Sequence, residues 1–379
     1  MNELARPRVP GGIFAGRNVQ TENSFWIRPE DRGTHMHVLG ASGKGKSSFL
    51  EACVLQDLMC IDGRPRSVTF IDRHGTSVER LLKLIAGYRL YRGRPIRLLR
   101  PADPAWAFSL NPFMGLNDPD VDLVALTDTI TTAILQAWGQ DRVTETPLIG
   151  EVLHNLLYAI GRLSLPLVDA MDFLSRERQR EREEHLARLV ALDPDAASFW
   201  LTLERLSANR RDEYLAPVRR RLQPFFASPF DRRIFSQTDR ALDVAEEMDR
   251  GSVLLVDLRP GPSLSADASR LIGLLLVNEF YTGAFRRKNK RPAYLYIDEC
   301  QEYLSPNIAR ILDETRKFSL SFVLAHQHLG HLRQAGEHVY RSVLTNTHVK
   351  VVFGGLDPTD AGEMAEIMFR GHFDLQRAK

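Results

Sequence analysis

The run from Gly40 to Ser47 constrains the fold of this chain more than any other feature. It reads Gly-Ala-Ser-Gly-Lys-Gly-Lys-Ser and matches the pattern G-x-x-x-x-G-K-[ST] in full. The apolar run Met36–Leu39 precedes it, and a helical pattern follows as far as about Leu58. Glycines between a buried strand and a helix let the backbone approach phosphate oxygens closely, and the helix N-terminus favours their negative charge. We therefore expect an α/β fold built around a P-loop.

The residues of this loop have expected roles toward Mg-ATP. Lys46 is expected to reach the β- and γ-phosphates, and the Ser47 hydroxyl is expected to bind Mg²⁺. Lys44 has a spacing that fits no phosphate role, so we expect it to be exposed. The alternative, a surface Gly/Lys loop without a ligand, is disfavoured by the flanking strand and helix. The predicted nucleotide-binding residues are Gly40, Ala41, Ser42, Gly43, Lys44, Gly45, Lys46, Ser47 and Ser48.

A second apolar run, Tyr294–Ile297, ends in the acidic pair Asp298 and Glu299. Beside a P-loop, Asp298 is expected to bind Mg²⁺ through water and Glu299 to polarise the attacking water. Gln327 follows the next predicted strand and would lie beside this pair if the strands are adjacent. It is then expected to sense the γ-phosphate or orient water. A helix cap or solvated turn for the acids, and an ordinary polar turn residue for Gln327, are the alternatives.

The remaining pattern predicts a mainly parallel sheet interrupted by a helical insertion. Apolar runs separated by helical patterns indicate strands buried on both faces; they are Val68–Ile71, Ile96–Leu99, Val253–Val256, Leu320–Ala325 and Val349–Phe353. Residues 121–250 are almost wholly helical in pattern. We expect a RecA-like P-loop NTPase core in residues 1–120 and 251–379, with an inserted all-α domain in 121–250. Ser305 and Pro306 are expected to cap and open one helix, and Asp357 another.

Composition limits the classes of protein that remain. The chain has 379 residues, 44% hydrophobic and 26% charged, which is typical of a soluble globular protein of more than one domain. It has neither an apolar run of about 20 residues for a membrane span nor a secretory signal at its beginning, so we expect a cytoplasmic protein. The net charge of +2 does not by itself indicate nucleic-acid binding. The basic runs Arg286–Arg291 and Arg219–Arg221 suit phosphate contacts or solvated loops equally well.

Three segments resemble one family of ATPases. Tyr294–Leu332 is similar to the Walker B and sensor region of conjugative coupling proteins, the type IV secretion DNA-transfer ATPases of the HerA–FtsK superfamily. His35–Ser48 is similar to their Walker A strand and loop. Asp72-Arg73-His74-Gly75 resembles the family's Asp-Pro-His-Gly turn, with Arg73 where proline is usual. The resemblance extends over most of the chain.

This resemblance implies a ring, expected to be hexameric, that threads DNA through a central pore, with secretion-system or relaxosome proteins as further partners. It also implies that Arg316 is an arginine finger acting in trans, with Lys317 as the runner-up. Family members carry N-terminal membrane spans, whereas only a short segment precedes this P-loop. The chain also ends at Lys379, where relatives often continue. We therefore expect a soluble cousin or a truncated chain.

The expected function is ATP-driven translocation of DNA in conjugative transfer or a related mobile-element process. Two alternatives use the same nucleotide chemistry. One is a motor for a protein substrate. The other is a slowly hydrolysing, nucleotide-gated switch or scaffold in a defence or signalling complex. Stimulation of the ATPase by DNA favours the first function, and stimulation by a partner protein alone favours the others.

Overall fold

The computed structural model describes residues 9, 11–59, 65–103, 105, 108–116, 121–138, 147–226, 228–238 and 240–369. These divide into two compact units. Unit 1 comprises residues 1–97, 247–256 and 289–379, and unit 2 comprises residues 98–246 and 257–288. The predicted division at residues 120 and 250 stays a prediction. No helix in the described ranges is both long enough and apolar enough to cross a bilayer.

A seven-stranded sheet forms the framework, in the order β5-β6-β4-β7-β8-β3-β9. The pairs β4–β7, β7–β8, β3–β8 and β3–β9 are parallel. Every residue of β3, β4, β6, β7 and β8 is buried, as apolar runs without alternation predict for strands covered on both faces. The strands are β3 (Met36–Leu39), β4 (Ser67–Asp72), β5 (Ile96–Leu99), β6 (Val253–Asp257), β7 (Ala293–Ile297), β8 (Leu320–His326) and β9 (Val349–Val352). The predicted α/β class with a mostly parallel sheet is confirmed.

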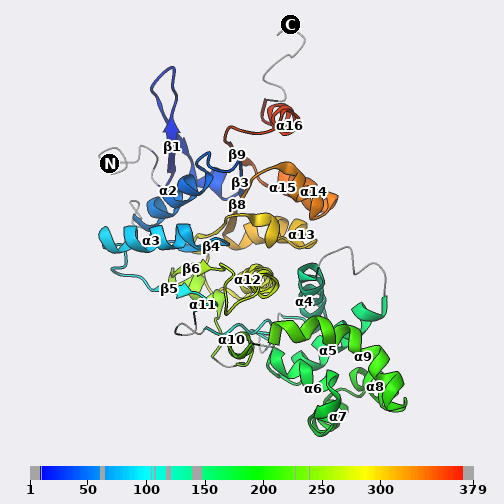
Figure 1. Ribbon diagram of the computed structural model, residues 1–379. Coiled ribbons are helices and arrows are strands. Elements are labelled where there is room, and N and C mark those ends of the chain that lie inside the picture. The colour runs from blue at the N-terminus through cyan, green and yellow to red at the C-terminus, as the bar shows by residue number, and fades with distance from the viewer. Residues whose placement is uncertain are drawn as a thin grey trace. The chain divides into compact units, whose positions relative to one another are not determined.

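The helices of unit 1 cover this sheet. Helices α2 (Lys46–Met59) and α3 (Thr76–Gly87) pack together and against β4, while α13 (Ile308–Thr315) packs against β8 and α15 (Glu337–Asn346). In Figure 1 these two groups lie on either side of the strands. The remaining elements are a separate hairpin, β1 (Ile13–Arg17) and β2 (Ser24–Ile27), and the helices α1 (Pro29–Arg32), α14 (Leu329–Gln334) and α16 (Pro358–Phe369).

Because neighbouring strands are parallel, the beginnings of the strands lie along one edge of the sheet and their ends along the opposite edge. Bonds from Val253 N to Pro95 O, from Ser67 N to Pro292 O and from Ala293 N to Ser319 O join residues at the beginnings of neighbouring strands. We call this the amino edge. The P-loop, Asp298 and Gln327 follow the ends of strands, and Asp72 is the last residue of β4, so all of them lie at the opposite, carboxyl edge. Ligands of open α/β sheets bind at the carboxyl edge.

Unit 2 is helical, as the pattern of residues 121–250 predicts. Helices α4 and α5 pack together, α4 packs on α12, and α5 packs on α9. The helices are α4 (Leu123–Ala137), α5 (Pro147–Arg162), α6 (Ala170–Leu174), α7 (Gln179–Leu192), α8 (Pro194–Glu204), α9 (Ala208–Leu222), α10 (Pro229–Ile234) and α12 (Ala266–Arg286). The short helix α11 (Val244–Arg250) spans the boundary between the two ranges.

One predicted cap is wrong and one is confirmed. Ser305 does not cap α13: the helix begins at Ile308, and Ser305 O accepts a bond from Ile308 N at 3.0 Å, so Ser-Pro-Asn forms a turn before the helix. A serine followed by proline starts turns as readily as helices. Asp357 does cap α16, because its Oδ1 accepts bonds from Thr359 N at 2.8 Å and Asp360 N at 3.1 Å.

A buried ion cluster ties helix α2 to the sheet. Asp57, near the end of α2, accepts bonds from Arg32 Nη1 and Nη2, both at 2.7 Å, and from Arg66 Nη1 at 2.8 Å. The hydroxyl of Tyr296, on β7, donates to Asp57 Oδ2 at 2.6 Å. Burial would raise the pKa of Asp57, but the guanidinium of Arg32 and the other donors outweigh it and lower that pKa. These bonds therefore hold α2, the helix that follows the P-loop, against β7, the strand that precedes Asp298.

Candidate nucleotide-binding site

The P-loop joins β3 to α2 with glycines where the backbone requires them. Gly43 has a φ of 71° and Gly45 a φ of 101°, a region that side chains other than glycine rarely adopt. Gly40 is needed for a different reason, since a Cβ there would lie 2.5 Å from the Cβ of Phe353. The loop can therefore keep this shape only with glycine at these positions. The first N–H groups of α2, from Lys46 onward, have no partner within the helix.

Lys46 lies over the inside of this loop. Its Nζ donates to Gly40 O at 2.6 Å and to Ala41 O at 3.2 Å, and only 5% of the residue is exposed. Both partners are neutral carbonyl oxygens, so the positive charge of Lys46 is not compensated by either of them. An ammonium group held in this way can exchange carbonyl oxygens for phosphate oxygens. Lys44 and Ser48 are exposed, as predicted for Lys44.

Ser47 and Asp298 are brought together from distant parts of the chain. The Ser47 hydroxyl donates to Asp298 Oδ2 at 2.7 Å, which joins the first turn of α2 to the end of β7. Burial raises the pKa of Asp298, the nearby charges of Glu299 and Asp72 raise it further, and the bond from Ser47 opposes them. Two oxygen ligands and an excess of negative charge are what a hard divalent cation requires.

Glu299 has its backbone in the left-handed region, with φ 52° and ψ 51°, which is uncommon for a residue with a side chain. Such strain is often found at functional sites. Both carboxylate oxygens are held by amides: Gln327 Nε2 donates to Oε1 at 2.7 Å, and Gln301 Nε2 donates to Oε2 at 2.9 Å. The adjacency of β7 and β8, on which the prediction for Gln327 depends, is confirmed.

The ionisation of Glu299 follows from these contacts. Burial would raise the pKa of its carboxyl group, but bonds from Gln301 and Gln327 and the positive charges of Lys46 and His74 outweigh burial, so the pKa is lowered. Glu299 is therefore ionised while the pKa of its neighbour Asp298 is raised. Two adjacent carboxyl groups whose environments move their pKa values in opposite directions are suited to different roles.

Two residues of this site had no distinct signal in the sequence. Gln301 was not predicted, because its contact with Glu299 depends on the turn after β7. Asp72 was noted only within its turn, yet it organises the start of α3. Its Oδ2 accepts bonds from Ser77 N at 2.8 Å and Val78 N at 3.2 Å. Within the same turn Arg73, which stands where proline is usual in the resembled family, pairs with Glu302.

Arg316 lies at the opposite edge of the sheet. It follows α13 in a short 3₁₀ turn, and its backbone oxygen accepts a bond from Ser319 N at 3.1 Å, just before β8 begins. Its side chain is exposed and forms no salt bridge within the described ranges. The carboxyl-edge residues Lys46, Ser47, Asp298, Glu299 and Gln327 are thus brought together, and Arg316 is not among them. Any contact between Arg316 and a bound nucleotide would have to be made with another subunit.

The arrangement fits Mg-ATP. The loop offers helix N–H groups, open space at Gly43, and a lysine without an acidic partner among its recorded contacts. Ser47 and Asp298 would hold Mg²⁺, whose chemistry there would be to neutralise charge on the phosphate oxygens. Glu299 is placed to accept a proton from water, and Gln327 to orient it. The thiol of Cys300 offers no alternative chemistry, because it is fully buried and burial raises its pKa well above the ordinary value.

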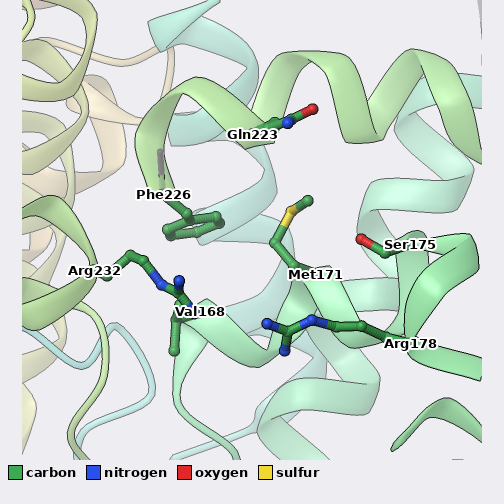
Figure 2. A pocket seen from close by; sticks show the side chains of 7 residues that line it. All are labelled: Val168, Met171, Ser175, Arg178, Gln223, Phe226 and Arg232. Atoms are coloured by element: carbon green, nitrogen blue, oxygen red, sulfur yellow. The ribbon is translucent and has the colours of Figure 1, made fainter. Parts of the chain in front are cut away.

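Unit 2 contains a separate small cavity of about 180 Å³. Figure 2 shows the guanidinium groups of Arg178 and Arg232 directed toward each other across it, with Met171 and Phe226 alongside. Arg178 is already paired with Asp172, whose other carboxylate oxygen lies 3.2 Å from His185 Nε2. Ligand pockets usually enclose about 300–1,000 Å³. We therefore assign no nucleotide to this cavity.

Comparisons with known proteins agree with this fold. Residues 270–379 match the family model described as the type IV secretion-system coupling protein DNA-binding domain. No curated protein sequence is similar enough to the chain to count as a relative.

Solved structures match over nearly the whole chain. The bacterial conjugative coupling protein TrwBdeltaN70, in its unbound form, matches with a TM-score of 0.64 at 16% identity, covering 97% of this chain and 78% of that one. TrwB in complex with ADP and Mg²⁺ matches with a TM-score of 0.62 at 15% identity, covering 96% and 79%. VirB4 of Thermoanaerobacter pseudethanolicus matches with a TM-score of 0.59 at 12% identity, covering 97% and 90%. These findings confirm the predicted resemblance: the chain has the fold of the coupling-protein P-loop ATPases, and its residues 270–379 match a family model of coupling proteins.

Proposed function

We propose that this protein hydrolyses Mg-ATP and uses the energy to move DNA as a ring motor of the coupling-protein type. The observation that carries the proposal is the meeting, at one edge of the sheet, of Ser47 with Asp298 and of Glu299 with Gln327, at 2.7 Å in each case. These four side chains come from the ends of three different segments, and a purely structural loop does not need them together. The match of TrwB structures bound to ADP and Mg²⁺ supports the same ligand here.

The chemistry follows from the positions of the side chains. On binding ATP, the ammonium group of Lys46 would leave the oxygens of Gly40 and Ala41 and bond to phosphate oxygens instead. Glu299, ionised and held by two amides, would take the proton of the attacking water. Gln327, already bonded to Glu299, would fix that water in line with the γ-phosphate. Phosphoryl transfer depends chiefly on such positioning and on charge stabilisation.

The partner and the assembly rest on the family. The match of residues 270–379 to a coupling-protein DNA-binding domain supports DNA as the partner. A ring, proposed to be hexameric, would place Arg316 of one subunit against the nucleotide of the next, which is consistent with its distance from its own P-loop edge. Secretion-system or relaxosome proteins, and a place in the cytoplasm, are parts of the same proposal.

The deciding experiment is the steady-state ATPase rate with and without single- and double-stranded DNA, at 50 mM and 200 mM salt. We expect Mg²⁺-dependent hydrolysis that DNA increases. The increase should be smaller at the higher salt, because the release of counterions from DNA then contributes less to binding. Hydrolysis that no DNA changes at 50 mM salt would reject the DNA motor and leave the protein-motor and switch functions. No hydrolysis under any condition would reject the ATPase itself.

A further inference from the structure

The segment between α3 and β5 has an unusual charge pattern. Every charged residue from Arg80 to Arg97 is basic, and the segment Tyr88–Arg94 contains the dipeptide Tyr-Arg twice, three residues apart. We call this segment the Tyr–Arg loop. The loop itself contains Arg89, Arg92 and Arg94; Arg80 and Lys83 belong to α3, and Arg97 belongs to β5. The positive charges of such a run repel one another, and concentrations of positive charge are common where an anionic partner binds.

The loop presents its aromatic and basic side chains to solvent. Tyr88 is 42% exposed and Tyr91 50% exposed, although tyrosine usually covers part of its ring. Arg89 and Arg92 are also exposed, and neither forms a salt bridge with any residue that the structure describes. By contrast Arg97, which lies in β5 beyond the loop, pairs with Glu247 at 2.9 Å. The exposed part of the loop therefore offers two rings and two guanidinium groups.

The backbone holds Arg89 in a conformation that favours glycine. Leu90 N bonds to Ile85 O at 2.9 Å and Arg89 N bonds to Ala86 O at 3.1 Å, which closes α3 with a Schellman turn. Arg89 occupies its left-handed position with a φ of 55°. An arginine at this position costs stability that a glycine would not. Residues held in such conformations are concentrated at functional sites.

The loop is fixed at both ends, and its position is far from the P-loop. Pro95 O accepts a bond from Val253 N at 2.9 Å, which anchors the loop at the amino edge of the sheet. Figure 1 shows it running along the outside from α3 to β5. The exposed cations Lys290, Arg316 and Lys317 precede β7 and β8 at the same edge. In strand order β7 is three places from β5, or about 14 Å at the usual strand spacing.

We infer that the Tyr–Arg loop binds single-stranded DNA, with Tyr88 and Tyr91 stacking on unpaired bases and Arg89 and Arg92 contacting the phosphates. Exposed aromatic rings next to cations are the features that bind single strands without reading sequence. Duplex DNA keeps its bases stacked on one another and offers these rings no face. The inference rests on DNA as the proposed partner, and it adds a contact surface outside residues 270–379, which match the DNA-binding family model.

The test measures the fluorescence anisotropy of a labelled oligothymidine, and of a duplex of equal length, with the full chain. We expect the single strand to bind more tightly to the parent protein. Tyr88→Ala with Tyr91→Ala should weaken binding of the single strand roughly tenfold or more. Tyr88→Phe with Tyr91→Phe should restore it, because phenylalanine keeps the stacking face. This rescue separates stacking from a role of the hydroxyl groups in the fold.

The arginines are tested by salt dependence. Arg89→Ala with Arg92→Ala should reduce the slope of log K against log salt by about 1.4, which corresponds to two lost phosphate contacts on a single strand. Arg180→Ala with Arg341→Ala is the matched control, since it removes two exposed arginines from other surfaces and should leave the slope almost unchanged. The ATPase rate without DNA should be unaffected in all of these variants, because the loop is at the opposite edge from the P-loop.

Other outcomes would overturn the inference. If the parent binds the oligothymidine and the alanine variants bind it equally well, the loop is not the contact, although the proposed DNA motor survives. If the parent binds no DNA, the proposed DNA partner fails and the inference fails with it. Cosedimentation with anionic phosphatidylglycerol vesicles that requires Tyr88 and Tyr91, without an effect on DNA, would assign the loop to a membrane. A change only in oligomer size, measured by light scattering, would assign it to a subunit contact.

Discussion

Gln327 Nε2 lies 2.7 Å from Glu299 Oε1, so the two side chains that the sequence predicts to act on the attacking water are in direct contact. They come from neighbouring parallel strands, β8 and β7. The contact has a measurable consequence. The bonds from Gln301 and Gln327 stabilise the ionised form of Glu299 and lower its pKa against the effect of burial.

Replacing Gln327 with alanine should shift the pH dependence of the ATPase. The bond stabilises the carboxylate, so its loss raises the pKa of Glu299. A general base must be deprotonated, and the acidic limb of the rate profile should therefore move to higher pH. Gln301→Ala should move it in the same direction, while Gln20→Ala, on the exposed hairpin, should not. If the acidic limb stays in place in both site variants, Glu299 is not the group that limits the rate at low pH.

Lys46→Ala should abolish ATP hydrolysis without unfolding the protein. The substitution removes the cation that the phosphates require, while the glycines continue to shape the loop. Lys44→Ala is the matched control, because Lys44 belongs to the same loop but is exposed, and it should retain a nearly normal rate. Circular dichroism checks the fold. Near-normal turnover in Lys46→Ala would rule out this loop as the catalytic site.

Glu299→Gln and Asp298→Asn should separate chemistry from metal binding. Glu299→Gln removes the base but keeps the size of the side chain, so ATP should remain bound and hydrolysis should fall about 100-fold or more, the contribution usual for general acid–base catalysis. Asp298→Asn should instead raise the Mg²⁺ concentration needed for half-maximal activity. Rapid filtration with labelled ATP and a Mg²⁺ titration measure the two effects. Hydrolysis at the parental rate in Glu299→Gln would show that another group is the base.

Asp57 provides a test of stability rather than of activity. Asp57→Ala would leave Arg32 and Arg66 without the carboxylate that compensates their charges, and breaking a buried pair in this way costs about 3–5 kcal/mol. Asp31→Ala is the control, since it breaks the exposed pair with Arg28 and should hardly change the Tm. Because the pKa of Asp57 is lowered in the folded state, its contribution is present near neutral pH and is lost as the pH falls through that pKa. Equal Tm values for the two variants, measured by calorimetry, would contradict this account.

The sequence predicted the parts of this site that depend on local pattern. The P-loop, Asp298 and Gln327 each follow an apolar run, and residues that follow parallel strands must meet at one edge of the sheet. The contacts between side chains were beyond such reasoning. Gln301 reaches Glu299 only because the turn after β7 places Glu299 in the left-handed region. The ion cluster at Asp57 joins residues that are up to 264 positions apart, which no local pattern encodes.

Two further features were visible in the sequence but could not be interpreted without the fold. The Tyr-Arg dipeptides of residues 88–92 can be read from the sequence. Their exposure could not be predicted, because it depends on α3 ending at Gly87. Ser305 and Pro306 carry the signals of a helix start, but the same residues favour a turn. The competition between turn and helix is decided by the packing of Ile308, Ile311 and Leu312, which are all buried.

The role proposed for Arg316 depends on assembly into a ring. It is exposed at the amino edge, whereas its own P-loop is at the carboxyl edge, so it cannot complete the site of its own subunit. A ring places the surface of one subunit against the nucleotide of the next, and a guanidinium group there would stabilise the charge that spreads over the γ-phosphate oxygens. The planar fork of arginine suits this better than the ammonium of Lys317.

Mixing of inactive subunits tests this assignment. Arg316→Ala and Lys46→Ala should each abolish the DNA-stimulated ATPase activity when they are alone, one by removing the finger and the other by removing the phosphate-binding lysine. Mixed rings should regain part of the activity, because some interfaces then pair an intact Lys46 with an intact Arg316 from the neighbour. Lys317→Ala is the control and should remain active. Normal hydrolysis by Arg316→Ala alone would exclude the finger, and inactive mixtures of two proteins shown to assemble together would exclude its action between subunits.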